Sequence, residues 1–188
     1  RESLDEEQKL LDVLPDVPDL QAAWLLLLFC AGPRANHWLR VVPPALAHNY
    51  ATGHDGLLQG TLASLLHRRR LSNQQKAVAQ LPLRLGGLGL RSAGRTTTAA
   101  YWASWADALP VLRKKVPSSA ENFLAELQKP AGSAQVQCLQ DANRARQQLT
   151  SAGFEACPAW EALWNGLRPQ KPAKAEPGDW PHGWQYYA

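Results

Sequence analysis

The fold class of this chain follows from residues 72–112, which read SNQQKAVAQLPLRLGGLGLRSAGRTTTAAYWASWADALPVL. Ser72 and Gln75 form a capping box, a pattern that begins a helix, and Pro82 ends that helix. A second helix is expected over residues 96–112, where Pro110 kinks or ends it. One face of this second helix carries the large side chains, Tyr101, Trp102, Trp105 and Leu109. The segment therefore predicts two helices joined by a glycine-rich connection.

The connection, residues 81–91, alternates apolar residues about a Gly-Gly pair. This pattern predicts a small hairpin or an extended, folded-back loop. The predicted turn residues are Gly86, Gly87 and Gly89, because a tight turn needs positive φ and only glycine adopts it without strain. The stretch has neither the lysine of a Walker loop nor the spacing of a dinucleotide-binding loop, so a phosphate cradle built from its backbone is disfavoured.

Helical patterns continue on both sides of this segment. Ser3 and Glu6 are expected to cap a helix that stops at Pro15. Asp19 is expected to cap a second helix, which is apolar all round, ends at Gly32-Pro33 and is therefore predicted to lie in the centre of the core. Further helices are predicted over residues 34–41, 46–66 (one broken helix or two, interrupted at Gly53, Gly56 and Gly60), 118–128 (capped by Ser118 and Glu121), 134–149 and 158–164.

These patterns predict an all-α protein, an irregular multi-helix bundle with one short extended or hairpin segment at the Gly-Gly-Leu-Gly turn. Residues 1–115 are interpreted as one helical region and residues 116–167 as an accessory helical region. Residues 168–188 are interpreted as a Pro- and Lys-rich linker followed by the start of a truncated module.

Composition limits the classes of protein that this chain can represent. It has 188 residues, of which 45% are apolar, enough for a hydrophobic core. Three sparse cysteines fit a reducing, intracellular compartment, and no secretory signal pattern is present. The longest apolar run, residues 22–31, is about half of the ~20 residues that a membrane span needs, so no membrane partner is expected. Because methionine is absent, we expect the chain to be a piece of a larger protein.

Charge is divided unevenly along the chain. Residues 1–23 are acidic, whereas residues 24–115 hold 12 basic side chains and only two acidic ones, Asp55 and Asp107. Such a field favours a polyanionic partner, and phosphate backbones are the commonest one inside cells. A solvated surface that only keeps the domain soluble is the alternative interpretation.

Residues that would carry catalysis or bind a metal are not grouped in the sequence. Cys138 and Cys157 lack neighbouring histidines at zinc-binding spacing, and buried or idle thiols are expected. We expect His48, His54 and Asp55 to face solvent rather than to form a metal or acid–base cluster. For Asp107 a helix cap or an arginine partner is expected. We predict no catalytic residue, no metal site and no cofactor in this segment.

Several stretches in order resemble the region that follows the polymerase core in reverse transcriptases of non-LTR (LINE-like) retrotransposons. The stretch from Leu81 to Leu109 carries the resemblance most strongly. Upstream, Phe29-Cys30-Ala31-Gly32-Pro33-Arg34, Trp38-Leu39-Arg40, Pro43-Pro44 and His54-Asp55 are similar to helical segments just beyond the palm of that family. About residues 20–112 are covered well by this similarity.

The resemblance implies a thumb and post-thumb region that grips the template–primer duplex, RNA or DNA, beside an upstream polymerase palm. The family's Mg²⁺-binding aspartates have no counterpart here, so the fragment is expected to be inactive alone. A nuclear location is expected for the parent RNA-directed DNA polymerase. The predicted nucleic-acid-binding side chains are Arg40, Arg68, Arg69, Arg70, Lys76, Arg84, Arg91 and Arg95.

Alternatives stay open at this point. The chain is alternatively a helical protein-interaction domain that uses tryptophan faces, or a decayed element copy without a selected function. Tyr101, Trp102 and Trp105 are interpreted as core residues, with base stacking as the other possibility. The leucines of residues 81–90 are expected either to pack into the hydrophobic core while the arginines stay in water, or to support arginines that contact phosphate.

Overall fold

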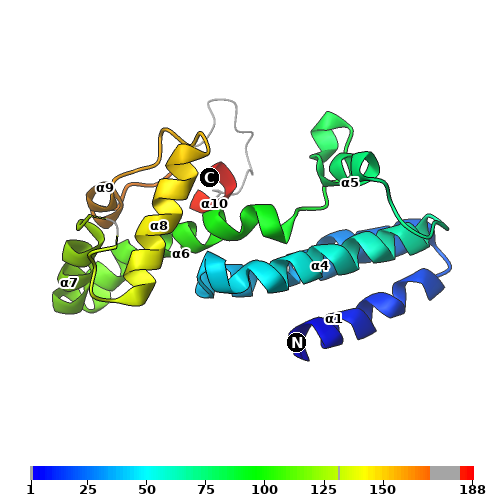
Figure 1. Cartoon of the computed structure of the whole chain (residues 1–188), viewed down its shortest axis with the longest axis horizontal. Helices are drawn as coiled ribbons and strands as arrows, with labels where there is room; N and C mark the ends of the chain where they lie inside the picture. Colours follow the sequence, from blue (N-terminus) through cyan, green and yellow to red (C-terminus); the bar gives the residue numbers. More distant parts are fainter. Residues whose placement is uncertain (1, 131, 170–182) are drawn as a thin grey trace. The chain divides into compact units, whose positions relative to one another are not determined.

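The computed structural model describes residues 2–130, 132–169 and 183–188, and all its regular secondary structure in these ranges is helical (Figure 1). The all-α prediction is confirmed. The chain forms two compact units: unit 1 contains Arg1–Leu39 and Leu46–Thr97, and unit 2 contains Arg40–Ala45 and Thr98–Ala188. The predicted boundary at residue 115 falls inside unit 2, because Trp102 and Leu109 belong to the core of that unit.

Unit 1 begins with helix α1, Glu2–Asp12, which packs along the long helix α4, Pro44–Leu65. The expected cap at Ser3 is wrong, because the helix already includes Glu2. The expected breaks in α4 are also wrong, since the helix runs uninterrupted through its three glycines. At Gly53 the missing side chain is needed: a Cβ there would lie 2.6 Å from Cδ1 of Leu4 on α1.

Between α1 and α4 the chain stays helical from residue 20 to residue 41. Helix α2, Leu20–Leu26, begins at Asp19, whose carboxylate accepts a hydrogen bond from the amide of Ala22 at 2.7 Å and confirms the predicted cap. A π-helical turn, Leu27–Ala31, and a 3₁₀ turn, Gly32–Arg34, then lead into α3, Ala35–Val41. The helix does not simply end at Gly32-Pro33, because Pro33 fits the first turn of the 3₁₀ segment, where no amide donor is required.

The prediction that the apolar helix after Asp19 is buried all round is wrong. Ala23, Leu27 and Ala31 point into the core of unit 1, whereas Leu25 and Phe29 are exposed, Phe29 to 65%. The core of this unit is closed by side chains from α1, α2, α4 and α5, the last of which spans Asn73–Gln80. Burial of this apolar face, and not the propensity of any one helix, supplies most of the stabilisation.

Helix α5 and the glycine turn form the remaining part of unit 1. The capping box of α5 is present as predicted: Ser72 Oγ accepts from the Gln75 amide, and the Ser72 amide donates to the Gln75 side chain. After it comes a 3₁₀ turn, Leu83–Leu85, and the chain then folds back so that the Leu90 amide donates to the Ala79 carbonyl at 3.1 Å. The folded-back loop is thus correct, and no hairpin strand forms in this described stretch.

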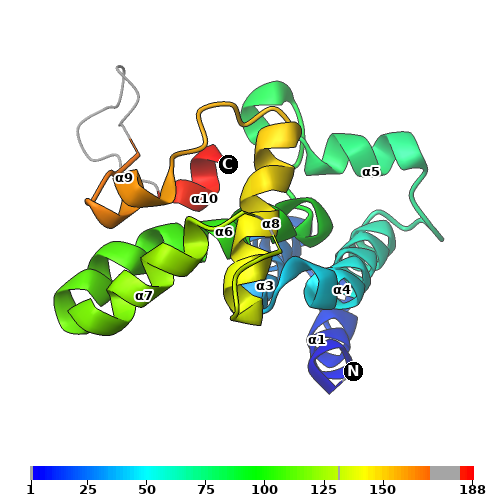
Figure 2. The same ribbon diagram turned by 60° about the vertical axis from the view of Figure 1, so that its left-hand side comes forward.

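Unit 2 is built around helix α6, Ala93–Lys115, whose last 18 residues, from Thr98 onward, lie in this unit. The helix does not end at Pro110. Its partners are α7, Pro117–Leu127; α8, Gln137–Ser151; α9, Trp160–Trp164; and α10, Trp184–Tyr187 (Figures 1 and 2). The predicted cap of α7 at Ser118 is wrong, since the helix begins earlier, at Pro117, a residue that suits a first helical position.

The core of unit 2 is aromatic. Trp102 is fully buried, and its ring meets those of Phe154 and Trp184 edge-on, both at 5.7 Å between centroids. Trp184 is therefore part of the core of unit 2. The predicted linker lies mostly outside the described residues, which omit 170–182.

Candidate nucleic-acid interface

The predicted cationic residues fall mainly on one stretch of unit 1, from the end of α4 to the first turn of α6. Arg68, Arg69 and Arg70 lie in the connection between α4 and α5, and Lys76 lies on α5. Arg84 lies in the 3₁₀ turn, and Arg91 and Arg95 lie on either side of the residue that begins α6. The six arginines are exposed and Lys76 is half-buried.

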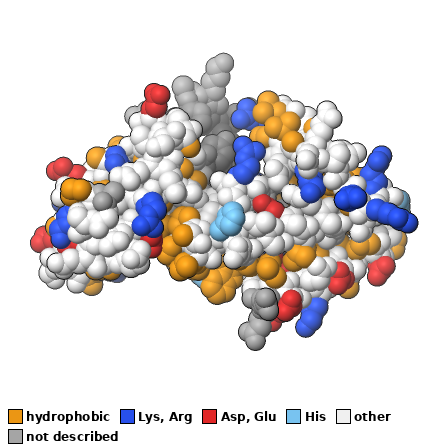
Figure 3. Space-filling model, in the orientation of Figure 1, with side chains coloured by type: hydrophobic (Ala, Val, Ile, Leu, Met, Phe, Trp, Pro, Cys, Tyr) orange, Lys and Arg blue, Asp and Glu red, His pale blue; other side chains and the backbone are white. Residues whose placement is uncertain are grey.

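A left-handed residue directs the chain into the arginine run. His67 lies just after the last residue of α4, Leu65, and has a φ of 53°. It is the single non-glycine residue with positive φ in the described ranges. The Arg68 amide donates to the Ala63 carbonyl at 2.8 Å and the His67 amide to the Ser64 carbonyl at 2.9 Å. These two bonds form a Schellman motif, which reverses the chain and places residues 68–70 beyond the end of the helix. In the space-filling view Lys and Arg side chains gather at this end of α4 (Figure 3).

None of these seven cations forms an ion pair with another residue in the described part of the chain. Asp55, the acidic residue that precedes them in unit 1, is otherwise engaged. Its Oδ1 accepts from the Ala93 amide at 2.7 Å, and its Oδ2 accepts from the Gly94 amide at 3.1 Å and the Ser92 hydroxyl at 2.6 Å. Asp55 therefore caps α6, and the amides at that helix end are not available to a phosphate.

Two of the predicted cations meet at one small recess. Lys76 on α5 and Arg91 before α6 line it, and the remaining lining residues are Asp55, Leu58, Gln59, Ala79, Gln80 and Leu90. Two cations from separate segments thus share one recess with an acidic residue and several apolar ones.

Arg40 does not belong to this surface. It lies in unit 2, where its Nη2 is 3.0 Å from Oδ2 of Asp107 and its Nη1 donates to the side chain of Gln185 at 3.3 Å. Because its guanidinium group is half-buried and already paired, Arg40 is not included among the cations proposed below to bind nucleic acid. The expected arginine partner of Asp107 is confirmed by the same contact.

The glycine turn differs from the prediction in what it exposes. Gly86 and Gly89 have φ of 76° and 73°, as a tight turn requires, whereas Gly87 is needed for space: a Cβ there would lie 2.1 Å from the carbonyl oxygen of Leu81.

The leucines of this stretch differ in burial. Leu90 is buried, but Leu83 and Leu85 are 63% and 58% exposed, so the leucines do not all pack into the core. Sequence reasoning missed these two residues. The available signal was that Leu-Arg-Leu, held between Pro82 and a Gly-Gly pair, is too short to bury both leucines.

The histidines near the middle of α4 differ in their exposure to solvent. His48 is exposed, but His54 is buried and bonds to Glu7, so the expectation that these residues face solvent is wrong for His54. The described residues contain no group of three or more His, Cys, Asp or Glu side chains arranged to hold a metal ion.

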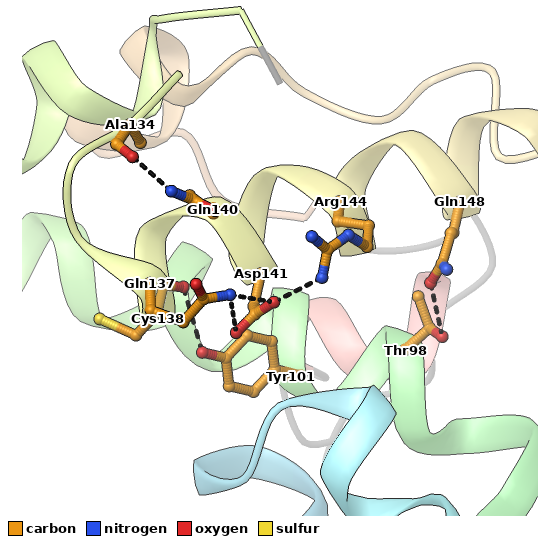
Figure 4. A network of polar contacts seen from close by, with 9 residues as sticks. All are labelled: Thr98, Tyr101, Ala134, Gln137, Cys138, Gln140, Asp141, Arg144 and Gln148. Atoms are coloured by element: carbon orange, nitrogen blue, oxygen red, sulfur yellow. Dashed lines mark hydrogen bonds and ion pairs between the residues drawn. The ribbon is translucent and has the colours of Figure 1, made fainter. Parts of the chain in front are cut away.

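In unit 2 the aromatic side chains pack in the hydrophobic core. Tyr101 is buried and donates to the Cys138 carbonyl at 3.2 Å, beside a chain of contacts in which Asp141 accepts from Gln137 and pairs with Arg144 at 2.7 Å (Figure 4). Burial raises the pKa of the Tyr101 hydroxyl. Burial also raises the pKa of Cys157, so this thiol is protonated and unreactive near neutral pH. Tyr101 and Trp102 are thus core residues and do not offer faces for base stacking.

The helices of the described ranges include none that is both long and apolar enough to cross a lipid bilayer. Comparison of the chain with protein-family models, with curated proteins and with solved structures found no match.

Proposed function

We propose that unit 1 grips a nucleic-acid duplex through its phosphate backbones, as the thumb region of a retroelement reverse transcriptase does. In this proposal the parent protein is an RNA-directed DNA polymerase of the nucleus. Its palm, upstream of this region, supplies the catalytic aspartates and Mg²⁺. The chain itself contributes grip and no chemistry.

The observation that carries the proposal is the unneutralised charge between residues 68 and 95. Asp55 is the sole acidic residue of the sequence between Asp19 and Asp107. Both of its oxygens accept hydrogen bonds from the start of α6, so it does not pair with any of the seven cations. Cations that form no ion pair among the described residues attract a polyanion over several ångströms and bind it with strong salt dependence.

The choice of side chain adds to this support. Six of the seven cations are arginines, whose planar guanidinium groups can each donate two parallel hydrogen bonds to a phosphate. Of the tryptophans that the competing interpretation, a partner-binding domain, would use, Trp102, Trp160 and Trp184 are buried within unit 2, whereas Trp38 is 45% exposed.

The test is a salt titration of duplex binding with matched charge variants. Arg69→Ala/Arg70→Ala removes two exposed cations from unit 1, and Lys114→Ala/Lys115→Ala removes two exposed cations from the end of α6. Binding of a fluorescent 20-base-pair RNA–DNA or DNA duplex is measured by anisotropy between about 50 and 200 mM salt.

We expect the arginine variant to bind less tightly at low salt and its log K against log salt slope to fall by about 0.9 for each phosphate contact removed. The lysine variant should behave as the unmodified chain does. Equal loss in both variants, or a salt-independent affinity, would contradict the proposal.

A further inference from the structure

Two leucines at the tip of the glycine turn are left in water beside the cationic surface. Leu83 and Leu85 are 63% and 58% exposed, and Arg84 stands between them in the sequence. A single exposed leucine is ordinary in a folded protein. Two on one short turn, with an exposed arginine between them in the sequence, leave apolar side chains uncovered next to a cation. We use the term leucine tip for Leu83 and Leu85.

The backbone of the turn holds the leucine tip in a fixed position. The Gly86 amide donates to the Leu83 carbonyl at 3.0 Å, the Gly87 amide to the Pro82 carbonyl at 3.2 Å, and the Gly89 amide to the Leu81 carbonyl at 2.8 Å. Gly89 lies against Leu83 and Leu28: a Cβ there would be 3.4 Å from Cγ of Leu83 and 3.8 Å from Cδ1 of Leu28, on the π-helical turn. A backbone fixed in this way does not have to be ordered on binding, so the ordering cost is limited to the side chains.

The same hydrogen bonds exclude one way of contacting nucleic acid. The amides of Gly86, Gly87 and Gly89 donate within the turn, so they do not form a cradle for phosphate. Any contact at this tip is therefore made by side chains: the guanidinium of Arg84, and the two apolar groups. The apolar groups have nothing to gain from phosphate, but bases are apolar on their faces.

We infer that Leu83 and Leu85 press against the bases of the bound nucleic acid, at a base step or at a duplex end, while the surrounding arginines hold its phosphates. This inference rests on the proposed function and assigns the leucine tip as a second kind of contact within it. Apolar side chains that wedge against base steps while cations hold the backbone are an established mode of binding.

An anionic membrane surface shares part of this chemistry, but the shape of the tip favours nucleic acid. Membrane-surface binding usually uses a helix with a continuous apolar face. Here the apolar groups are two side chains on a 3₁₀ turn of three residues, which gives too little apolar area for a membrane anchor.

The experiment uses the whole chain and the variant Leu83→Ala/Leu85→Ala. The matched control is Leu46→Ala, since Leu46 on α4 is 74% exposed and lies outside the cationic stretch. The probe is a duplex with a recessed end that carries 2-aminopurine in its last base pair, because this base fluoresces more strongly when it is unstacked.

With the unmodified chain and with the control, we expect fluorescence to rise on binding. The leucine variant should bind about tenfold more weakly and lose the rise, while its salt slope stays unchanged because the phosphate contacts remain. Leu83→Met/Leu85→Met should restore affinity, because methionine keeps the apolar volume.

Unchanged affinity and an unchanged fluorescence rise in the leucine variant would overturn the inference. So would a loss of binding confined to vesicles that contain phosphatidylserine, since this result would assign the tip to a membrane. Failure of the proposed function is recognised separately, through the Arg69→Ala/Arg70→Ala variant, so the two outcomes are distinguishable.

Discussion

His54 and Glu7 form a buried contact that joins two helices of unit 1: Nδ1 of His54 on α4 lies 2.7 Å from Oε2 of Glu7 on α1. The other carboxylate oxygen accepts a hydrogen bond from the hydroxyl of Tyr50 at 2.5 Å. The second ring nitrogen of His54 lies 3.2 Å from the carbonyl oxygen of Gly32. One polar cluster therefore ties α1, α4 and the 3₁₀ turn at residue 32 together.

Burial and hydrogen bonds shift the pKa of Glu7 in opposite directions. Burial alone would raise the pKa of Glu7, but the hydrogen bonds from His54 and Tyr50 outweigh it, and the pKa of this carboxyl lies below its ordinary value. For Tyr50, burial and the neighbouring Glu7 carboxylate act in the same direction and raise the pKa of the hydroxyl well above its ordinary value. Tyr50 thus keeps its proton and donates a hydrogen bond to Glu7.

Replacing Glu7 by alanine is expected to destabilise unit 1 strongly. The substitution removes a buried acceptor and leaves the His54 ring and the Tyr50 hydroxyl without their partner, a loss of about 3 kcal/mol in the free energy of unfolding. Urea denaturation measures it. Glu6→Ala, one residue away on the exposed side of α1, should change the same quantity by less than about 0.5 kcal/mol. Similar effects of the two substitutions would show that the buried cluster does not stabilise the unit.

The lowered pKa of Glu7 predicts a dependence of stability on pH. A carboxyl whose pKa is lower in the folded state than in the unfolded state stabilises the fold above the unfolded value, and this contribution is lost as the pH falls through the folded value. We therefore expect the free energy of unfolding to fall on acidification below about pH 4.5. In Glu7→Gln the fall should be shallower than in the unmodified chain, when both are followed by urea denaturation at a series of pH values. A parallel pH profile in the variant would contradict this assignment.

Asp55→Ala is expected to loosen the start of α6. The carboxylate satisfies the amides of Ala93 and Gly94, which have no partner within the helix, and loss of such a cap costs about 1–2 kcal/mol. The measurements are thermal denaturation and amide hydrogen exchange, which should accelerate at residues 93 and 94. Asp55→Asn retains an acceptor oxygen and should restore part of the protection. Unchanged exchange in the alanine variant would show that the cap does not hold the helix end.

Local patterns in the sequence predicted local structure well where a hydrogen bond closes over three or four residues. The capping box at Ser72 and the cap at Asp19 are both formed, because each depends only on its own turn. The same kind of pattern failed at Ser118, where Pro117 has a fixed φ suited to the first turn and starts the helix earlier.

Features that depend on distant partners were not predictable. The sequence does not show that residue 54 meets residue 7, since 47 positions separate them and no local period connects them. Nor does it show which side of the apolar helix near Phe29 stays uncovered, because composition gives the amount of apolar surface and not its neighbours. Arg40 was assigned to the cationic surface for the same reason: its pairing with Asp107 spans 67 positions.

Arg40 and Arg84 are therefore expected to respond differently to the same substitution. Arg84→Ala should weaken duplex binding, because this exposed guanidinium has no ion-pair partner among the described residues. Arg40→Ala should leave binding unchanged and lower the free energy of unfolding by about 1 kcal/mol or less, since its ion pair with Asp107 is about one-third exposed and partly screened. Anisotropy and urea denaturation measure the two effects. A larger loss of binding in Arg40→Ala than in Arg84→Ala would reverse the assignment.

Three glycines of unit 1 should give three different outcomes when each is replaced by alanine. Gly56 lies inside α4 with open space around its Cβ position, so alanine should stabilise the helix by about 1 kcal/mol. Gly86 also has open space, but its φ of 76° is unfavourable for alanine, and we expect a loss of about 1 kcal/mol. Gly87→Ala should cost most, because the new Cβ would lie 2.1 Å from a backbone oxygen, which cannot move aside as a flexible side chain does. Thermal denaturation ranks the three variants. If Gly87→Ala proved as stable as Gly86→Ala, the close packing of the turn against residue 81 would be wrong, and with it the fixed position of the leucine tip.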